Sequence, residues 1–290
     1  MKSAYLTVIF SAILYGSISA IAKPSLNSIN PILLSSLIYL IIGVVLTIIV
    51  KISRNNIIVN IHSLKLIFLT SVCGAVIGPI LFFYGLKLTN ASIASLLINA
   101  EFLFSILLAV TIVKEKPGKT AYIGIILIFI GLLILNLRIG TFDLSQNNNN
   151  FIGNMFIIGA TIFWALDNNI SRLILDKEIP ITKIIQIKSL IGGVLSFGLV
   201  SIFNISLAIN AFQIPNLLFL SLGGFAGSLF LFLKGMKEIG TVKSVMIFST
   251  SSIFGIVFAL IFLKENIESW RLVLSVFIII PGIYLICKNS

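Results

Sequence analysis

The sequence has few charged residues, few cysteines and almost no histidine. Only 10% of its 290 residues are charged, and it contains 2 cysteines and 1 histidine. Cys73 and Cys287 stand apart in apolar surroundings, and His62 lies in a polar, basic segment, so no metal-ligand or catalytic pairing is visible. Complete phosphate-loop, HExxH and G-x-S-x-G patterns are also absent from the sequence. We therefore expect no enzyme, no cofactor and no resident metal.

Apolar residues are abundant instead. They make up 58% of the chain, and the mean hydropathy is +1.16. A soluble core cannot bury so much apolar surface, which indicates a lipid environment. The formal net charge is +11, but the basic residues fall between apolar runs. This pattern favours membrane topology over nucleic-acid binding, and we expect no nucleic-acid partner.

Ten apolar runs are long enough to predict membrane-spanning helices, since a bilayer core of roughly 30 Å needs about 20 apolar residues. The fold class we predict is an all-α polytopic membrane protein. The longest polar interruption, RIGTFDLSQNNNN, predicts a linker at 141–150 between two domains, 1–140 and 151–290. The predicted spans are 3–22, 32–50, 65–86, 91–113, 120–137, 151–173, 183–203, 213–234, 243–263 and 268–287.

The two halves of the sequence resemble each other. LLINAEFLFSILLAVTIVKE (96–115) aligns without gaps with MIFSTSSIFGIVFALIFLKE (246–265), and both end in Lys-Glu. Tyr15 in the first predicted span likewise aligns with Trp164 in the sixth. Each half therefore holds five spans, and an odd number means that the second half enters the membrane from the opposite side. Two inverted five-helix repeats are typical of secondary transporters.

The distribution of Lys and Arg predicts the orientation. With a cytoplasmic N-terminus, 15 of the 20 basic residues fall on the inner side and 5 on the outer side. The positive-inside rule therefore places both termini in the cytoplasm. The predicted location is the plasma (inner) membrane.

Four runs together resemble the drug/metabolite transporter superfamily, in its EamA-domain branch, over essentially the whole chain. They are LLINAE in the fourth span, WALDNNISR in the sixth, KSLIGG in the seventh and GSLFLFLKGMKEIGT in the eighth. The resemblance implies an exporter or importer of small metabolites and leaves the metabolite open. Many members of the family have a proline in the fourth and ninth spans, where this chain has Phe102 and Ser252.

Glu101 is the first candidate site residue, because an ionisable side chain in mid-membrane is costly, by roughly 2.5–3.5 kcal/mol, unless it faces a cavity or a partner. Helical spacing in a continuous fourth span places it on one stripe with Ala94, Leu97 and Ser105. A cavity position that could carry a proton and a neutral acid that hydrogen-bonds a neighbouring helix both remain open. Its repeat partner is Ser251, so the predicted site is chemically asymmetric.

The sixth span supplies the other candidates. Trp164, Asp167 and Asn168 share a helical face toward the predicted cavity. Asp167 lies at a depth similar to that of Lys188 in the seventh span. Two alternatives therefore remain open for Lys188: an ion pair with Asp167, or a side chain that extends to the membrane interface. Tyr15 is a cavity candidate from its alignment with Trp164. Asn169 points away from that face, and Asn99 lies on a different face of the fourth span from Glu101, so both are interpreted as packing residues between helices.

Two functions from different classes are compatible with the sequence. The first is a secondary carrier that moves a small metabolite, such as an amino acid or a similar amphipathic solute, by alternating access, with export as the expected direction. Coupling to protons or to solute exchange, and assembly as a homodimer, stay open. The second is a non-transporting membrane protein, either a lipid-processing enzyme or an assembly scaffold. A polar cavity between the two halves would favour the carrier, and a solid core would contradict it.

Overall fold

The computed structural model describes residues 2–52, 59–108, 119–136, 148–175, 179–239, 244, 247–265 and 270–288. Every regular element among them is a helix. Six helices are long and apolar enough to cross a membrane: Ala4–Ser25, Pro31–Ile52, Ile61–Leu88, Asn150–Leu175, Ile181–Ile202 and Ala211–Ile239. Four shorter apolar helices are Ala91–Ser105, Tyr122–Gly131, Ser251–Leu263 and Val273–Gly282. Most of the predicted linker, residues 141–147, and the pair Lys114-Glu115 lie outside the described residues.

The first half runs from α1 to α7, and the second from α8 to α14. The elements of the first half are α1 (Lys2–Ser25), α2 (Pro31–Ile52), α3 (Ile61–Ser71), η1 (Val72–Ile77), α4 (Gly78–Leu88), α5 (Ala91–Leu97), α6 (Ala100–Leu108) and α7 (Lys119–Asn136). Those of the second half are α8 (Asn148–Leu175), α9 (Ile181–Ile202), η3 (Ala211–Gln213), α10 (Ile214–Leu218), η4 (Phe219–Gly227), α11 (Ser228–Ile239), α13 (Ser251–Leu263) and α14 (Trp270–Lys288).

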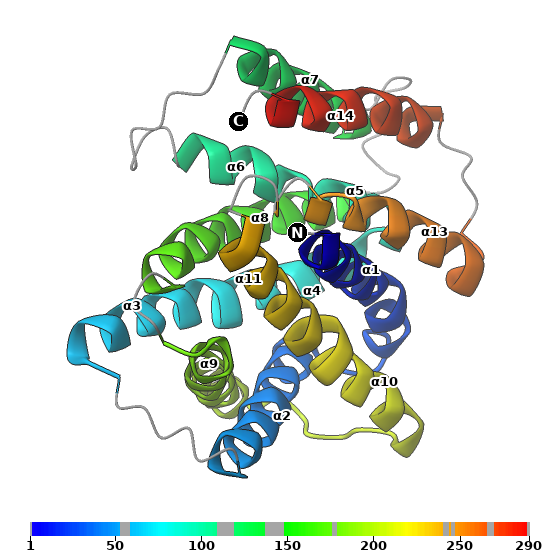
Figure 1. Cartoon of the computed structure of the whole chain (residues 1–290). Helices are drawn as coiled ribbons and strands as arrows, with labels where there is room; N and C mark the ends of the chain where they lie inside the picture. The colour runs from blue at the N-terminus through cyan, green and yellow to red at the C-terminus, as the bar shows by residue number, and fades with distance from the viewer. Residues whose placement is uncertain are drawn as a thin grey trace.

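The helices of one half pack mainly on those of the other (Figure 1). Helix α2 packs along α9, and α7 along α14, so matching elements pair with each other. The opening helix of each half contacts the third and fourth spans of the opposite half, because α1 packs on α11 and α13 while α8 packs on α4 and α6. These reciprocal contacts enclose the centre of the molecule between the two halves.

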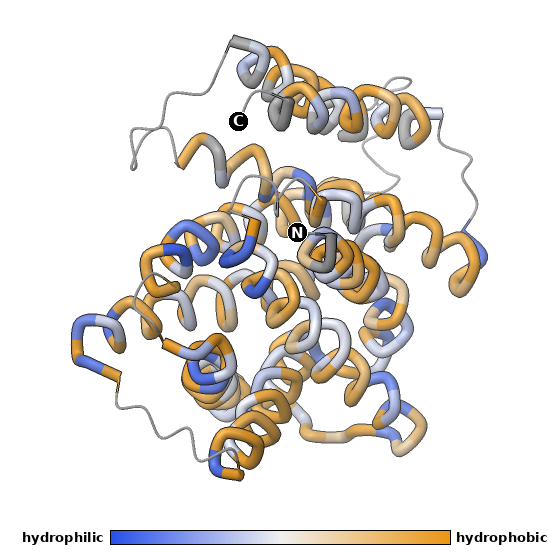
Figure 2. Tube along the Cα trace, viewed as in Figure 1, coloured by the Kyte–Doolittle hydropathy of each residue, from blue (hydrophilic) through white to orange (hydrophobic). Residues whose placement is uncertain are grey.

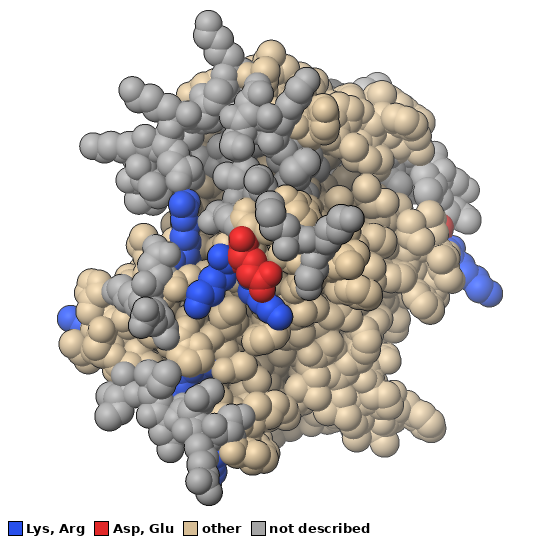
Figure 3. Space-filling model, viewed as in Figure 1, with Lys and Arg blue, Asp and Glu red and all other residues tan. Residues whose placement is uncertain are grey.

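The outer surface is largely apolar. Figure 2 shows hydrophobic residues along most of the helices, and Figure 3 shows a face on which uncharged side chains predominate. Large exposed apolar side chains include Phe277 at 72%, Phe262 at 67% and Val194 at 62% exposure. An apolar surface of this extent would be unfavourable in water and suits contact with lipid.

The third span of each half contains a π-helical segment, η1 in the first half and η4 in the second. At the repeat spacing of 150 residues, 72–77 corresponds to 222–227, so the two segments occupy matching positions. Gly74 of η1 packs directly on Asp167 of α8, and Gly224 of η4 packs on Ile18 of α1. The small residues let the helices approach closely where the helical turn is wide.

Substitution of Gly74 by alanine is expected to destabilise the fold. A Cβ atom there would lie 2.0 Å from Oδ2 of Asp167, and neither the buried carboxylate nor the backbone can move freely. We expect a loss of about 1–3 kcal/mol, as for other overpacked cores. Thermal unfolding of the purified protein measures this loss. The matched control is Gly198→Ala, because a Cβ atom at Gly198 would meet nothing within 4 Å. Equal stability of the two variants would contradict the expected clash.

The predicted fourth span departs from regular α-helix geometry at one turn. Helix α5 ends at Leu97 and α6 begins at Ala100, and the turn between them, at Ile98 and Asn99, has hydrogen bonds that span three residues. The predicted stripe through Leu97, Glu101 and Ser105 assumed an unbroken α-helical register across this turn. The predicted ninth span has a similar turn at Ser249 and Thr250 before α13. No proline stands at either turn.

Two charged side chains bind backbone groups at helix ends. The Glu265 carboxylate accepts hydrogen bonds from the backbone N–H of Ala91 at 2.7 Å and of Ser92 at 3.0 Å, at the start of α5. The Lys23 ammonium group donates to the carbonyls of Leu86 at 2.7 Å and Thr89 at 2.6 Å, at the end of α4. The α4–α5 connection is therefore tied to helices from both halves.

Candidate functional site

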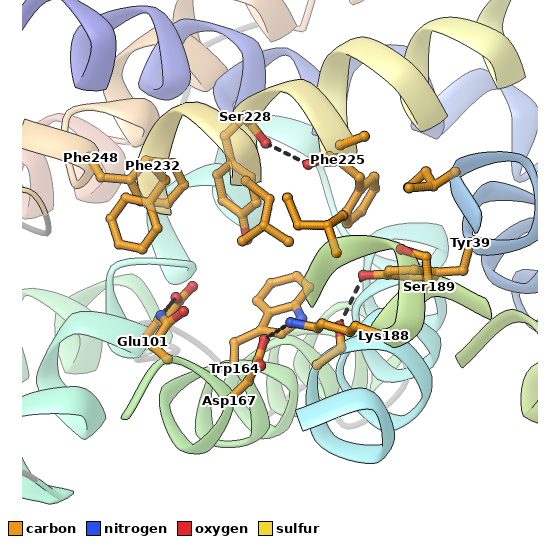
Figure 4. Close-up of a pocket in the computed structure, with 17 residues that line it drawn as sticks. Tyr39, Glu101, Trp164, Asp167, Lys188, Ser189, Phe225, Ser228, Phe232 and Phe248 are labelled. Carbon is orange, nitrogen blue, oxygen red and sulfur yellow. Dashed lines mark hydrogen bonds and ion pairs between the residues drawn. The ribbon is translucent and has the colours of Figure 1, made fainter. Parts of the chain in front are cut away.

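A cavity lies at the centre of the molecule, between the two halves (Figure 4). Its empty volume, including the space at its mouth, is about 590 Å³. The walls come from α1, α2, η1, α6, α8, α9, η4 and α11. Six of the seven candidate residues line it: Tyr15, Glu101, Trp164, Asp167, Asn168 and Lys188.

One wall of this cavity holds an ion pair. The Lys188 ammonium group of α9 donates to Oδ2 of Asp167 on α8, and their side chains are 4% and 7% exposed. The hydroxyl of Ser171 donates to the other carboxylate oxygen at 3.2 Å. Of the two alternatives for Lys188, the structure therefore has the intramembrane pair and not a lysine extended toward the interface. The pair neutralises itself, so it contributes no net charge to the cavity.

Glu101 stands apart from this pair on the same side of the cavity (Figure 4). Its Oε1 accepts a hydrogen bond of 2.5 Å from the side-chain amide of Asn168. Among the described residues, no lysine or arginine forms a salt bridge with Glu101. Glu101 and Asn168, both predicted to line the cavity, are thus in contact. The other oxygen of the Glu101 carboxyl group has no hydrogen-bond partner in the described part of the chain.

Aromatic rings face these polar groups. The rings of Tyr15 and Phe248 are tilted by 44° with centres 4.8 Å apart, Tyr15 and Trp164 meet edge to face at 6.1 Å, and Phe232 and Phe248 lie 4.6 Å apart. Figure 4 shows Phe232 and Phe248 across from Glu101, and Trp164 between Glu101 and Lys188. Aromatic faces attract cations as well as apolar groups. The cavity therefore combines surfaces that suit a cation with surfaces that suit an apolar group.

A second, smaller cavity adjoins the first. It has an empty volume of about 340 Å³, and Glu101, Asn168, Phe232 and Phe248 line both cavities. Ser251, the seventh candidate, lines the smaller one together with Asn99. Asn99, interpreted from the sequence as a packing residue on another face than Glu101, is buried and borders this cavity together with Glu101. Asn169 lines neither of these two cavities, and its amide donates to the Ala165 carbonyl at 2.8 Å.

Sequence reasoning missed Tyr39. Its hydroxyl donates to the Gly74 carbonyl within η1 at 2.9 Å, and its ring lines the cavity opposite Phe225 at 5.8 Å. The repeat contains a signal for it, since continuing the spacing of 149 residues aligns Pro31 with Pro180 and Tyr39 with Lys188. The same comparison aligns Ile18 with Asp167, so the ion pair has no counterpart in the first half.

The model of the EamA-like transporter family matches residues 2–137 and again residues 151–288. The chain belongs to the EamA-like transporter family. This family is part of the drug/metabolite transporter superfamily, as the sequence motifs predicted. The two matched segments are one copy of the family domain in each half, so the EamA domain is duplicated, and the cavity lies between the two copies.

Relatives of this EamA-like protein include uncharacterised transporters from three organisms. The one from Methanothermobacter thermautotrophicus is 28% identical, with 99% of this chain and 86% of the relative covered. That from Clostridium kluyveri is 24% identical, with 100% and 95% covered. The third, from Archaeoglobus fulgidus, is 25% identical, with 80% and 78% covered. A crystal structure with 18% identity covers 98% of this chain and 96% of its own, with a TM-score of 0.70, and this likeness concerns the fold alone.

Proposed function

We propose that this membrane transporter is a secondary carrier that exports a small amphipathic solute with an ammonium group, such as an amino acid, by alternating access. The observation that carries the proposal is the cavity between the two domains, where Glu101 offers a carboxylate without a cationic partner opposite an aromatic wall. Asp167 and Lys188 neutralise each other, so a substrate cation finds its counter-charge at Glu101. Tyr15, Trp164 and Asn168 complete the proposed binding surface.

The proposal includes a topology of ten spans in two inverted five-helix repeats, 1–140 and 151–290, with both termini in the cytoplasm and the protein in the plasma membrane. The reciprocal packing of α1 and α8 on the opposite halves supports the inversion. The matching positions of η1 and η4, and of the two interrupted spans, support the repeat. The excess of Lys and Arg on one side supports the orientation.

Glu101 is also the proposed coupling residue. A carboxyl group that alternately holds a proton and a substrate cation exchanges one for the other across the membrane. Of the two alternative functions, a lipid-processing enzyme and an assembly scaffold, the cavity disfavours the scaffold, which has no need of a chamber between its halves. A homodimer would leave this site within each chain, because all seven candidate residues line cavities formed by one chain.

Counterflow in proteoliposomes tests the proposal. Vesicles loaded with a mixture of unlabelled amino acids should accumulate the matching labelled amino acid from outside, and empty vesicles should not. The expected result is uptake driven by exchange alone, without ATP. A pH gradient, acid outside, should change the rate if Glu101 carries the proton. No uptake of any amino acid or apolar amine above that of protein-free vesicles would contradict the carrier proposal.

A further inference from the structure

The smaller cavity contains polar groups that the proposed contact with an ammonium group does not use. The side chain of Asn99 is 3% exposed, and its Nδ2 atom has no hydrogen-bond partner among the described residues. The hydroxyl of Ser105 is also buried without a partner there. Both residues line this cavity, and so does Ser251. A buried donor without an acceptor costs about 1–3 kcal/mol, so such donors are expected to have a ligand in the working state.

The backbone at the starts of α6 and α13 is already hydrogen-bonded. The N–H of Glu101 donates to the carbonyl of Ile98 at 2.9 Å, and the N–H of Ile253 donates to that of Thr250 at 3.0 Å. The donors that this cavity offers to an anion are therefore side chains.

The two cavities meet at Glu101, which lines both. An ammonium group on Glu101 therefore has the donor-rich cavity on one side and the larger aromatic cavity on the other. An amino acid carries a carboxylate one carbon from its ammonium group and a side chain on the same carbon. With its ammonium group on Glu101, an amino acid can therefore place its carboxylate in the smaller cavity and its side chain in the larger one.

We infer that the smaller cavity is a carboxylate subsite, in which Asn99, Ser105 and Ser251 donate hydrogen bonds to the carboxylate of the substrate. The inference rests on the proposed function and makes it more specific. It assigns Asn99 to substrate contact and separates amino acids from simple amines. An amine with the same side chain would fill the aromatic cavity and reach Glu101, but it would leave the donors of the smaller cavity unpaired.

Paired ligands that differ only in the carboxylate test this inference. Purified full-length protein in lipid nanodiscs is titrated with phenylalanine and phenethylamine, leucine and isoamylamine, and tryptophan and tryptamine. The thermal midpoint reports binding, because a ligand of the folded state stabilises it. We expect at least one amino acid to bind about tenfold or more tightly than its amine, the ratio that one or two lost hydrogen bonds to a charged group produce.

The decisive variant is Asn99→Asp, which keeps the size of the side chain but places a negative charge where the carboxylate binds. This variant should bind the amino acid about tenfold or more weakly than the unmodified protein does, and it should bind the amine equally well or more tightly. Ser251→Ala removes one hydroxyl with little risk to the fold and should weaken only the amino acid. The matched control is Asn204→Asp, the same change at an exposed position in the turn after α9, which should behave as the unmodified protein.

The outcomes separate the two proposals. Equal affinity of the unmodified protein for acid and amine would overturn the carboxylate subsite while leaving the carrier in place. So would an equal loss of both ligands in Asn99→Asp and Ser251→Ala. Binding of neither ligand in any pair, together with no counterflow, would overturn the proposed function, and the subsite with it.

Discussion

Glu101→Gln should reduce exchange of an ammonium-bearing solute by an order of magnitude or more while leaving the protein folded. Glutamine has the same shape, and its side-chain carbonyl can still accept the hydrogen bond from Asn168. What it lacks is the negative charge, and a hydrogen bond to a charged group contributes about 1.5–3 kcal/mol, which corresponds to roughly a 10- to 150-fold loss of affinity. Counterflow of the best substrate measures the loss, and its response to a pH gradient should disappear as well.

The control for this experiment is Glu238→Gln, the same substitution at an exposed position on α11. Both variants should elute as single species on gel filtration and should reconstitute in equal amounts. Transport should then differ by an order of magnitude or more between them. Unchanged uptake and unchanged pH dependence in Glu101→Gln would remove Glu101 from the proposed mechanism and with it the counter-charge for the substrate.

Loss of one partner from the Asp167–Lys188 pair is the second large effect. Lys188→Met leaves the buried Asp167 carboxylate without its cation, and removal of one partner from a buried pair costs about 3–5 kcal/mol. Asp167→Asn leaves the lysine unpaired with a similar loss. The double variant should recover most of the stability, because it buries no charge. Chemical unfolding of the purified protein gives the coupling free energy of this double-mutant cycle.

Lys234→Met serves as the control, since this exposed lysine on α11 should contribute little. If the unfolding free energies of the single variants lie within about 1 kcal/mol of that of the unmodified protein, the two charges are solvated and not buried together. A double variant as unstable as the singles would mean that packing, and not charge, explains the losses. A stable double variant that still transports would show that the pair supports the structure without contacting the substrate.

Much of the fold could be predicted because it depends on patterns that can be recognised in a single sequence. Long apolar runs predicted the helices, and the spacing of 150 residues paired the two halves. The site was partly predictable for a related reason: an acid such as Glu101 in an apolar span is costly, so its position points to a cavity. Asp167 and Lys188 could be paired by depth, although the choice between a pair and an interfacial lysine needed the structure.

The features of the site that the sequence did not predict depend on departures from regular helix geometry. The stripe drawn through Glu101 assumed 100° per residue across Ile98 and Asn99, whereas the turn there has hydrogen bonds over three residues, and Asn99 and Glu101 border the same cavity. No proline or glycine stands at this turn, so nothing local in the sequence announced it. Tyr39 was missed for another reason, since an aromatic residue in a span is ordinarily packing and only its alignment with Lys188 distinguishes it.

The interrupted span has no proline between residues 91 and 108, so each of these residues keeps the N–H that a continuous helix requires. The turn at Asn99 and an unbroken helix are therefore two hydrogen-bonding patterns of one segment, and the packing around it selects between them. At the turn the hydrogen bonds span three residues, from the N–H of Glu101 to the carbonyl of Ile98 and from that of Phe102 to Asn99. A 3₁₀ turn rises about 2.0 Å and rotates about 120° per residue, against about 1.5 Å and about 100° in an α-helix. Conversion of the turn to α-helix would therefore shorten the span by about 0.5 Å and rotate α6 by about 20° for each residue converted. The packing around one turn thus sets the direction in which the Glu101 carboxyl group points.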